Sequence, residues 1–427
     1  MNAGIGSRRA VAGKFEDMSN EPGTAPAPAP APGPSGTPAH GSRIHGCLLG
    51  GALGDALGYA VEFDDIAAIR ARFGPAGLQD FSALDAGTPF SDDTQMTLYT
   101  ADGLLEALEW ANDGVAADIN ACLWLAYLRW LGTQGEAAPP SAPAQPPRWI
   151  DGQDVLKNRR APGNACLTGL ATGEMGTVQR PVNPESKGCG TVMRSAPFGL
   201  IPHIEPDTVY KLSADAASLT HGHPAARQGA GVFSLVIHAL ASGAGLREAT
   251  ESALGRLRGG VLRKGEDPDP DLVARLEAVL RLAGDAPTAG GVLSPEALVS
   301  QLGEGWVAEE ALAVALYAVL ATLPESEGQP ARGTETAAGA GSGSASASAS
   351  AGEASTAGTA GPEAHFRAAI AVAVNHSGDS DSTASIAGNI LGAYYGEQCL
   401  PAGWLAALEA PEVIRGMASR LAAVTGS

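Results

Sequence analysis

Apolar residues recur at spacings of three and four along most of this chain, which is the spacing of one face of an α-helix. The pattern is clear in nine segments, at residues 44–60, 94–111, 117–131, 208–219, 225–240, 272–282, 309–323, 366–374 and 382–395. Alternating runs of β-branched residues, which would indicate strands, are scarce. The sequence therefore predicts an all-α fold made of many helices.

Two stretches interrupt the helical pattern. Residues 21–38 read EPGTAPAPAPAPGPSGTP, and residues 325–362 are mostly Gly, Ser, Ala and Thr. Neither stretch has enough apolar residues to offset the entropy lost on ordering. We therefore predict a disordered Pro/Ala-rich tail at residues 1–41 and a flexible insert at residues 325–362. The motifs are spread over the remainder, which favours a single compact domain at residues 42–427.

The first predicted helix carries glycine at every fourth position, at Gly46, Gly50, Gly54 and Gly58. Each glycine costs about 1 kcal/mol relative to alanine inside a helix. A phosphate-binding loop does not explain them, because the sequence lacks GxxxxGK[ST] and no strand precedes the helix. We expect another backbone to pack closely on this glycine strip, and we leave the end of the helix, residues 55–62, as a possible site.

Two acidic clusters stand at the start of predicted helices. One is Ser91-Asp92-Asp93-Thr94, and the other runs from Asp379 to Thr383 and contains a second aspartate, Asp381. Taken singly, each is explained by helix capping and by the attraction of acids to a helix N-terminus. A calcium-binding EF-hand is excluded for the second cluster, because Ala384 and Ile390 occupy the positions that need Gly and Glu.

Considered together, the two clusters suggest a metal centre. Each supplies two carboxylates and flanking hydroxyls, which is more than a cap needs. Four carboxylates in a small volume would raise one another's pKa or recruit cations. Oxygen ligands without thiolate or imidazole favour Mg²⁺ or Mn²⁺ over zinc, and two such ions would balance the charge and activate a water.

The net charge and the distribution of apolar residues argue against a nucleic-acid-binding, secreted or membrane-spanning protein. The net charge is −19, from 46 acidic and 27 basic residues. We therefore expect no strong general binding of nucleic acid or anionic membrane. The five cysteines form no CxxC pair, the N-terminus lacks a signal-peptide pattern, and the most apolar stretch, residues 229–243, is too short to span a bilayer. A cytoplasmic protein with reduced thiols is expected.

Two further motifs remain ambiguous from their residues alone. The run at residues 186–191, SKGCGT, is either an ordinary glycine-rich turn or a loop whose backbone N–H groups bind an anion. His221 and His223 in THGHP suit helix capping or burial better than a zinc site. Arg194, which follows the glycine-rich run, is expected to form an ion pair.

Five stretches together resemble the ADP-ribosylglycohydrolase family. They are GALGDALGYAVEF, SDDTQMTLYTADGL, SKGCGTVMRSAPFGL, LTHGHPAA and VNHSGDSDSTASIAGNILGAYYG, in the family's order. The resemblance covers about residues 43–240 and 365–396. It implies an all-α fold with a binuclear Mg²⁺ or Mn²⁺ centre that hydrolyses the N- or O-glycosidic bond at C1″ of protein-linked ADP-ribose. We favour arginine as the attachment because the chain is rich in alanine.

The resemblance also implies roles for individual residues. The expected metal ligands are Ser91, Asp92, Asp93, Asp379, Asp381 and Ser382. The expected catalytic residues are Glu62, Asp92, Asp93 and Asp379. The expected substrate-binding residues are Ser186, Lys187, Gly188, Cys189, Gly190, Thr191 and His221. Asn375, His376 and Ser377 are expected to support the second acidic motif.

Some positions depart from the family pattern, and alternatives stay open. Ser91 and Ser382 replace threonines common in relatives, which keeps the hydroxyl, and Thr191 stands where glycine is frequent. The same acids would also suit a binuclear phosphohydrolase, or the chain could be a non-catalytic ADP-ribose-binding relative. Serine, O-acetyl-ADP-ribose and nucleobase linkages remain alternatives to arginine. We expect the protein to act as a monomer.

Overall fold

A computed structural model describes residues 37–84, 88–286, 291–324 and 361–426. Most of the predicted tail (1–41) and nearly all of the predicted insert (325–362) lie outside these residues. Contacts divide the chain into Met1–Thr37 and Pro38–Ser427, and the second unit contains the whole fold described below.

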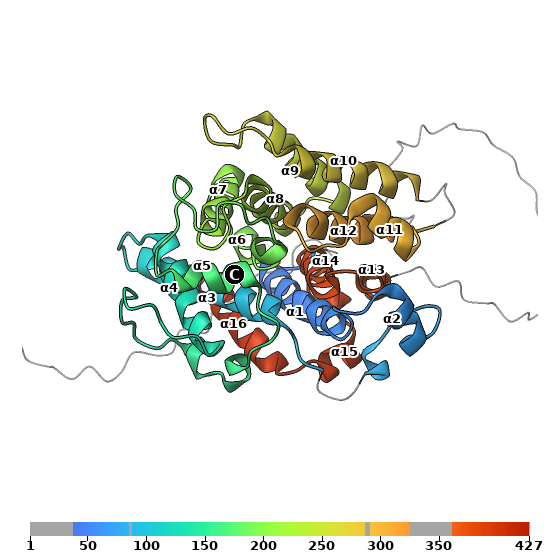
Figure 1. The fold of residues 1–427 in the computed structure, drawn as a ribbon, viewed down its shortest axis with the longest axis horizontal. Coiled ribbons are helices and arrows are strands. Elements are labelled where there is room, and N and C mark those ends of the chain that lie inside the picture. Colours follow the sequence, from blue (N-terminus) through green and yellow to red (C-terminus); the bar gives the residue numbers. More distant parts are fainter. Residues whose placement is uncertain (1–36, 85–87, 287–290, 325–360, 427) are drawn as a thin grey trace, which may run out of the picture. The chain divides into compact units, whose positions relative to one another are not determined.

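Helices make up the described structure, and no strand occurs in it, which confirms the all-α prediction (Figure 1). The sixteen α-helices there are α1 (His40–Tyr59), α2 (Ile66–Phe73), α3 (Asp92–Asn112), α4 (Ile119–Thr133), α5 (Asn164–Ala171), α6 (Ala196–Gly199), α7 (Pro206–Ala217), α8 (Pro224–Ala241), α9 (Leu246–Gly259), α10 (Pro270–Asp285), α11 (Pro295–Leu302), α12 (Ala308–Ala321), α13 (Pro362–Val374), α14 (Ser380–Tyr395), α15 (Ala402–Ala407) and α16 (Pro411–Thr425). Short 3₁₀ helices include Cys189–Thr191, which lies between α5 and α6.

All nine segments with a helical pattern form helices, and seven helices were not predicted. Five of the seven (α2, α5, α6, α11 and α15) have eight residues or fewer, too few for the spacing of apolar residues to stand out. The other two are α9 and α16. Each buries one face on which alanines are mixed with larger apolar residues.

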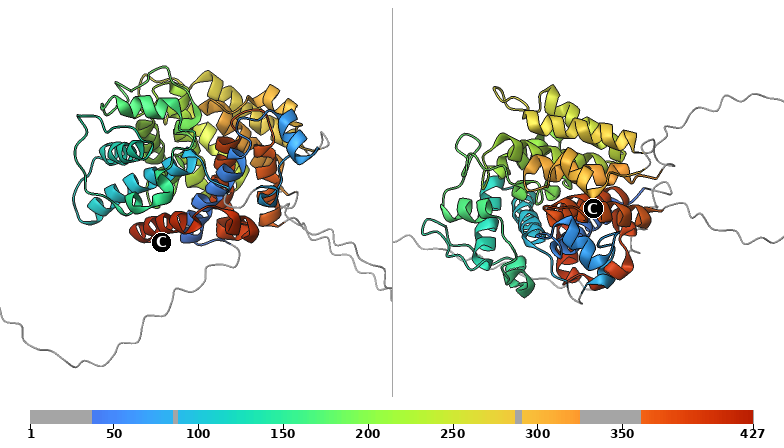
Figure 2. Two further views of the ribbon diagram at one scale, coloured as in Figure 1. Left: turned by 60° about the horizontal axis from the view of Figure 1, so that its bottom comes forward. Right: turned by 45° about the vertical axis from the view of Figure 1, so that its right-hand side comes forward.

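The glycine strip of α1 packs directly against the backbone of α14, as predicted. The two helices are antiparallel neighbours in the views of Figures 1 and 2. A Cβ atom at Gly46 would lie 2.5 Å from Gly392 O, and one at Gly50 would lie 2.5 Å from Gly388 O. A Cβ atom at Gly54 would overlap the carbonyl oxygen of Ala384. The end of α1 is therefore held against the start of α14, where the second acidic motif lies.

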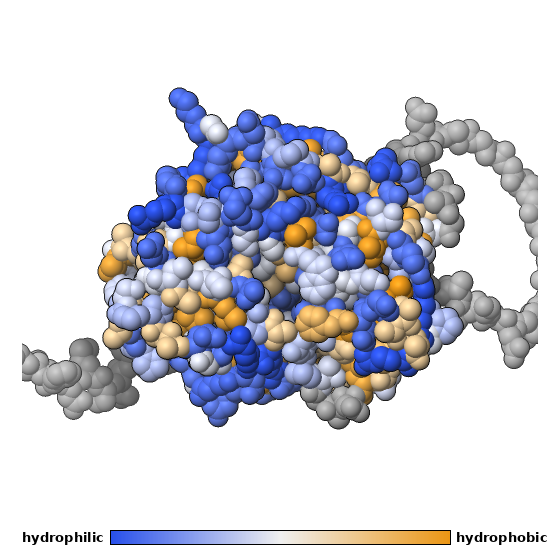
Figure 3. All heavy atoms as spheres, in the orientation of Figure 1, coloured by the Kyte–Doolittle hydropathy of each residue, from blue (hydrophilic) through white to orange (hydrophobic). Residues whose placement is uncertain are grey.

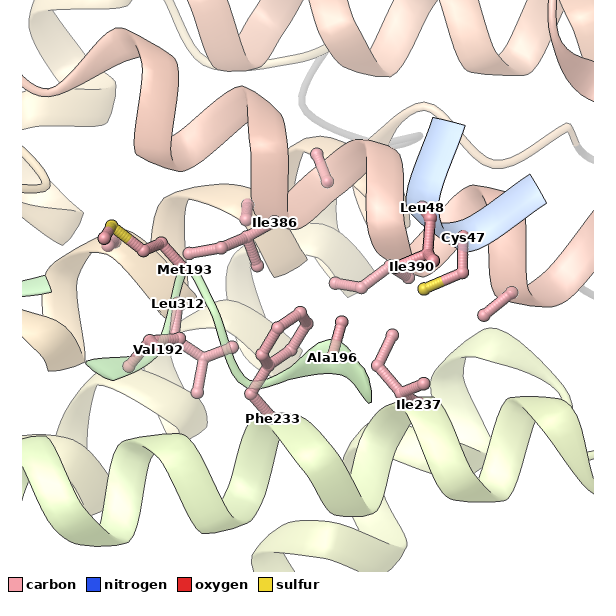
Figure 4. Close-up of a cluster of buried hydrophobic side chains, with 14 of the residues drawn as sticks. Cys47, Leu48, Val192, Met193, Ala196, Phe233, Ile237, Leu312, Ile386 and Ile390 are labelled. Atoms are coloured by element: carbon pink, nitrogen blue, oxygen red, sulfur yellow. The ribbon is translucent and has the colours of Figure 1, made fainter. Parts of the chain in front are cut away.

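Apolar side chains fix α14 from its other side. Figure 4 shows Ile386 of α14 beside Met193 and Leu312, with Phe233 of α8 closing the cluster. Ile390 and Leu391 are also buried, whereas Tyr394 is half-buried. Because Met193 stands two residues after the glycine-rich run, this cluster ties that run to the helix carrying the second acidic motif.

Hydrophilic residues cover much of the face shown in Figure 3, with apolar residues in small groups between them. None of the described helices combines the length and the apolar content needed to cross a bilayer. Five large apolar side chains in the described residues are strongly exposed, namely Phe63, Trp110, Val115, Val292 and Trp306.

Candidate metal centre and pocket

The two acidic motifs meet in one pocket of about 380 Å³. Five carboxylates line it, those of Glu62, Asp92, Asp93, Asp379 and Asp381. They come from the residues after α1, the start of α3 and the start of α14. The close packing of α1 on α14 and the placement of α3 beside both helices bring these distant parts of the sequence together.

The carboxylates are close enough to share a cation. Glu62, Asp379 and Asp381 each offer an oxygen within 4.8 Å of the others, and all three residues are buried. Glu62 Oε2 and Asp93 Oδ2 are buried without a hydrogen-bond partner among the described residues. Unpaired buried carboxylate oxygens are costly unless they meet a cation or hold a proton, so this donor set fits hard divalent ions.

Burial and mutual repulsion raise the pKa values of this cluster. Burial, followed by the charge of Asp381, raises the pKa of Asp55 to about 7. Burial, followed by the charges of Asp381, Asp92 and Asp55, raises the pKa of Glu62 to about 9. The pKa values of Asp92, Asp93 and Asp379 are also well above the usual range, chiefly through burial. The cluster therefore holds protons at neutral pH unless cations replace them.

Asp55 organises the first acidic motif from α1. Its carboxylate accepts hydrogen bonds from Ser91 N (2.8 Å), from Thr94 N (2.9 Å) and from the Thr94 hydroxyl. Ser91 is also the N-cap of α3, since its Oγ accepts from Asp93 N at 3.1 Å. Helix capping is therefore a correct interpretation for Ser91. Asp92 and Asp93 instead line the pocket. The individual role of Asp55 was not predicted; only its place at the end of the glycine strip pointed to it.

The segment from Arg160 to Gly163 holds Asp92, a contact that no pattern in the sequence predicts. Gly163 N donates to Asp92 Oδ2 at 3.1 Å, and Asp92 N donates to Arg160 O at 3.1 Å. Arg160 is anchored by an ion pair with Glu409. Ala161 between them lines the pocket and has φ of +50°, an uncommon conformation for a residue with a side chain.

The second acidic motif contacts the glycine-rich run. Cys189 Sγ donates to Asp379 Oδ2 at 2.9 Å, and the Ser382 hydroxyl lies 3.5 Å from the same sulfur. Ser382 N donates to Asp381 Oδ1 at 2.9 Å. Burial and the neighbouring Asp379 raise the pKa of Cys189, so its sulfur is a neutral thiol here.

The three residues before this motif support it from behind. The Asn375 side chain accepts from Leu78 N (2.7 Å) and donates to Leu78 O (2.8 Å). His376 Nε2 lies 3.0 Å from the Thr383 hydroxyl, and Ser377 Oγ accepts from Ile66 N at 3.0 Å. These contacts fix the turn that leads into α14.

The predicted substrate residues at 186–191 divide into two groups. Ser186, Gly188, Cys189 and Gly190 line the pocket. The Lys187 ammonium instead binds Glu309 Oε1 at 2.6 Å, so this side chain is already paired.

The last residue of the run also faces inward. Thr191 is buried and donates to Ala226 O at 2.8 Å. The backbone N–H of Cys189, in the same run, donates to Trp306 O at 3.2 Å. It is therefore not available to bind an anion.

His221 lines the same pocket and is oriented by Arg194. Arg194 Nη2 donates to the Thr220 hydroxyl at 2.8 Å, and that hydroxyl lies 2.7 Å from His221 Nδ1. Burial, and then the Arg194 charge, lower the pKa of His221 to about 3, so the ring is neutral. His223 does not line this pocket; its Nδ1 caps α8 by accepting from Ala225 N.

The expected ion pair of Arg194 is wrong for the part of the chain described. Its guanidinium is buried above the Tyr127 ring, 4.5 Å from the centroid, and also approaches Cys166 Sγ at 3.4 Å. Contacts with an aromatic ring, a thiol and a hydroxyl take the place of a carboxylate.

Comparisons with known proteins agree with this architecture. The sequence model of the ADP-ribosylglycohydrolase family matches residues 36–427. A curated relative, ADP-ribosylhydrolase ARH3 of Danio rerio, is 25% identical over 249 residues, which span 55% of this chain and 57% of that relative. A solved structure described as an ADP-ribosylglycohydrolase-related protein complex is 23% identical, with a TM-score of 0.54 over 90% of this chain and 99% of that one. This last likeness shows a common fold.

Proposed function

Because this chain belongs to the ADP-ribosylglycohydrolase family, we propose that it hydrolyses the glycosidic bond at C1″ of ADP-ribose attached to a protein side chain, with arginine favoured. The observation that carries this proposal is the meeting of five buried carboxylates from three separate parts of the sequence in one pocket. Structural ion-pair networks also bury acids, but these lack basic partners among the described residues that line the pocket.

Two Mg²⁺ or Mn²⁺ ions are the proposed cofactors. We assign them to the oxygens of the two acidic motifs, at Ser91, Asp92, Asp93, Asp379, Asp381 and Ser382. The closeness of Asp379 to Asp381 supports this assignment. When bound, the ions would supply positive charge that stabilises the anionic oxygens of the substrate and of the attacking water.

The side chains suggest how the proton moves. The water oxygen forms a bond to C1″ while the bond from C1″ to the leaving nitrogen breaks, and the electron pair leaves with the nitrogen. We assign Asp93 Oδ2 to orient the water and accept its proton, because this atom has no other partner. Glu62, whose buried Oε2 has no hydrogen-bond partner among the described residues, is assigned to deliver a proton to the leaving nitrogen. The proton released by the water balances the one delivered.

The walls of the pocket suggest where the rest of the substrate binds. We assign the ribose and diphosphate to the side formed by Ser186, Gly188, Gly190 and His221, and Cys189, whose sulfur contacts Asp379, adjoins the acidic motifs. A Cβ atom at Gly190 would lie 3.1 Å from His221 Cε1, so glycine keeps this wall open. The neutral His221 ring offers a hydrogen bond without carrying a charge.

The preference for arginine rests on charge. No lysine or arginine is among the described lining residues, whereas five carboxylates are. A cationic leaving group is favoured in such a site over a neutral hydroxyl. We further propose an ADP-ribosylated protein as the partner, a cytoplasmic location and a monomeric state.

A substrate panel tests this proposal. Wild type, Asp92→Asn and the exposed-surface control Asp113→Asn would be incubated with Mg²⁺ or Mn²⁺ and peptides carrying ADP-ribose on arginine or serine, and the products separated by chromatography. Free ADP-ribose, lost in Asp92→Asn and retained in Asp113→Asn, is expected. Release of phosphate instead would indicate a phosphohydrolase, and the absence of any product would contradict the proposal.

A further inference from the structure

Two aromatic side chains stand at the mouth of the pocket with their surfaces open to solvent. Phe63 is 74% exposed and Trp306 is 40% exposed, and both line the pocket. Their rings are nearly parallel, with centroids 6.3 Å apart and an interplanar angle of 19°. They are two of the five strongly exposed large apolar side chains in the described residues, so this surface is set apart from the remaining, mostly polar exterior.

Both rings are held next to the carboxylates. Phe63 directly follows Glu62, the proposed acid. The backbone at Trp306 is fixed because its carbonyl accepts from Cys189 N at 3.2 Å. A Cβ atom at the preceding residue, Gly305, would lie 3.3 Å from Asp379 Cβ, so this loop touches the second acidic motif. The rings therefore border the carboxylates at which the proposed function places the cleaved bond.

The charge of this region selects the kind of group that would rest on the rings. Five carboxylates line the pocket. With Glu62 protonated as the proposed acid, two divalent ions would balance the other four charges, so the lining would carry no excess positive charge. The nearest basic groups are already engaged, since Lys187 binds Glu309 and Arg194 lies behind Thr220. A lining without excess positive charge beside exposed aromatic faces favours a planar cation, because the faces themselves attract positive charge.

We propose that Phe63 and Trp306 form a leaving-group subsite that binds the guanidinium of an ADP-ribosylated arginine. The proposal rests on the proposed function. A guanidinium is planar and weakly hydrated, so it stacks on aromatic faces more readily than an ammonium does. A serine side chain gains nothing from the two rings, and the subsite therefore separates arginine from serine linkages.

The adenine ring of the substrate is the other planar group that would stack here. Its attached diphosphate would then have to lie against the carboxylates, which is unfavourable. Gly188 lies between the His221 ring and the backbone of Trp306. A Cβ atom at Gly188 would lie 3.4 Å from His221 Nε2 and 3.9 Å from Trp306 O. The diphosphate is better placed on the side of His221, behind which Arg194 carries its charge.

Steady-state kinetics on two peptides, carrying ADP-ribose on arginine or on serine, test the subsite. The variants are Phe63→Ala, Trp306→Ala, Trp306→Phe and the control Trp110→Ala, an exposed tryptophan in α3 outside the pocket. Both alanine variants of the pair should raise KM for the arginine peptide roughly 3- to 20-fold and leave the serine peptide unchanged. Trp306→Phe should retain most of the affinity because it keeps an aromatic face, and Trp110→Ala should match wild type.

The outcomes separate this inference from the proposed function. An unchanged ratio of the two peptides in Phe63→Ala and Trp306→Ala, or a wild-type preference for serine, overturns the subsite while hydrolysis still stands. An equal loss on both peptides, with weaker binding of free ADP-ribose, assigns the rings to adenine and also overturns it.

A binding measurement decides the question if wild type cleaves neither peptide. Calorimetric titration with methylguanidinium in the presence of ADP-ribose, with methylammonium as the control, does not need turnover. Selective binding of methylguanidinium that Trp306→Ala removes supports the subsite. Equal heats for the two cations, or for the two proteins, contradict it.

Discussion

Gly58 of α1 and Asp381 of α14 are in backbone contact, so closely that a Cβ atom at Gly58 would lie 2.5 Å from Asp381 Cα. The glycine strip thus sets the position of a proposed metal ligand as well as the distance between two helices. Any side chain at Gly58 must push the start of α14 away, and the other carboxylates of the pocket would not follow.

Gly58→Ala is expected to lower both stability and metal affinity. Overpacking should cost about 1–3 kcal/mol of unfolding free energy, and displacement of Asp381 should weaken Mn²⁺ binding. Urea unfolding and Mn²⁺ titration measure the two effects. Gly255→Ala in α9 is the matched control, because nothing lies within 4 Å of its added Cβ atom. It should gain up to about 1 kcal/mol and bind Mn²⁺ normally; equal behaviour of the two variants would contradict the role of the strip.

The sequence predicted the parts of this arrangement that depend on local pattern. The helical spacing of apolar residues predicted nine helices. The helix stability lost at the glycines from Gly46 to Gly58 predicted a backbone packed closely against them. The identity of that neighbour, α14, was not visible, because pairing between distant segments depends on tertiary contacts. The resemblance to the family already implied that the two acidic motifs form one site.

Other parts of the site carry no local signal. Arg160 to Gly163 reach Asp92 through backbone atoms, which any sequence could supply. Asp55 is one acid in a glycine-rich helix, and its three hydrogen bonds to the start of α3 exist only after folding. Lys187 shows the converse, since a basic residue in a glycine-rich loop suggests an anion site, yet it pairs with Glu309.

Asp55→Asn should damage the metal site without touching a proposed ligand. The amide offers one acceptor where the carboxylate accepts from Ser91 N, Thr94 N and the Thr94 hydroxyl. Loss of buried hydrogen bonds is expected to cost about 1–3 kcal/mol of unfolding free energy and to weaken Mn²⁺ binding at least about threefold. Denaturation and titration of Asp55→Asn beside Asp113→Asn check this. Unchanged Mn²⁺ affinity in Asp55→Asn would show that the start of α3 needs no support from α1.

The metal-free protein should lose stability as the pH rises. The pKa values of Asp55 (about 7) and Glu62 (about 9) lie above those of the unfolded chain, near 4. Between these values the folded state binds more protons than the unfolded state, so raising the pH favours unfolding. In EDTA, the unfolding free energy should fall by at least about 2 kcal/mol between pH 5 and pH 8.

Saturating Mg²⁺ should remove most of this loss, because cations then replace the protons of the cluster. Thermal and urea unfolding at both pH values, with and without Mg²⁺, give the comparison. A metal-free protein that is equally stable or more stable at pH 8 would contradict the proposed crowding of carboxylates.

Arg194→Met should separate substrate binding from stability. The buried guanidinium has no carboxylate partner in the described chain, so an apolar side chain of similar length should change the unfolding free energy by less than about 1.5 kcal/mol. Thr220 and His221 would lose their orienting donor, and affinity for ADP-ribose should fall roughly 3- to 10-fold. Calorimetry measures the affinity, and ¹⁵N NMR of His221 reports its tautomer. If the tautomer and the affinity are both unchanged, Arg194 only packs.

Binding of Mn²⁺ to the wild-type chain, counted by equilibrium titration with electron paramagnetic resonance detection of the free ion, tests the central claim most directly. The claim is that the motifs at Asp92 and Asp381 form one binuclear centre. Two ions per chain are predicted for wild type, with tight binding lost in Asp92→Asn and in Asp381→Asn alike, and retained in Asp113→Asn. No bound ion in wild type, or full binding in either pocket variant, would contradict the claim.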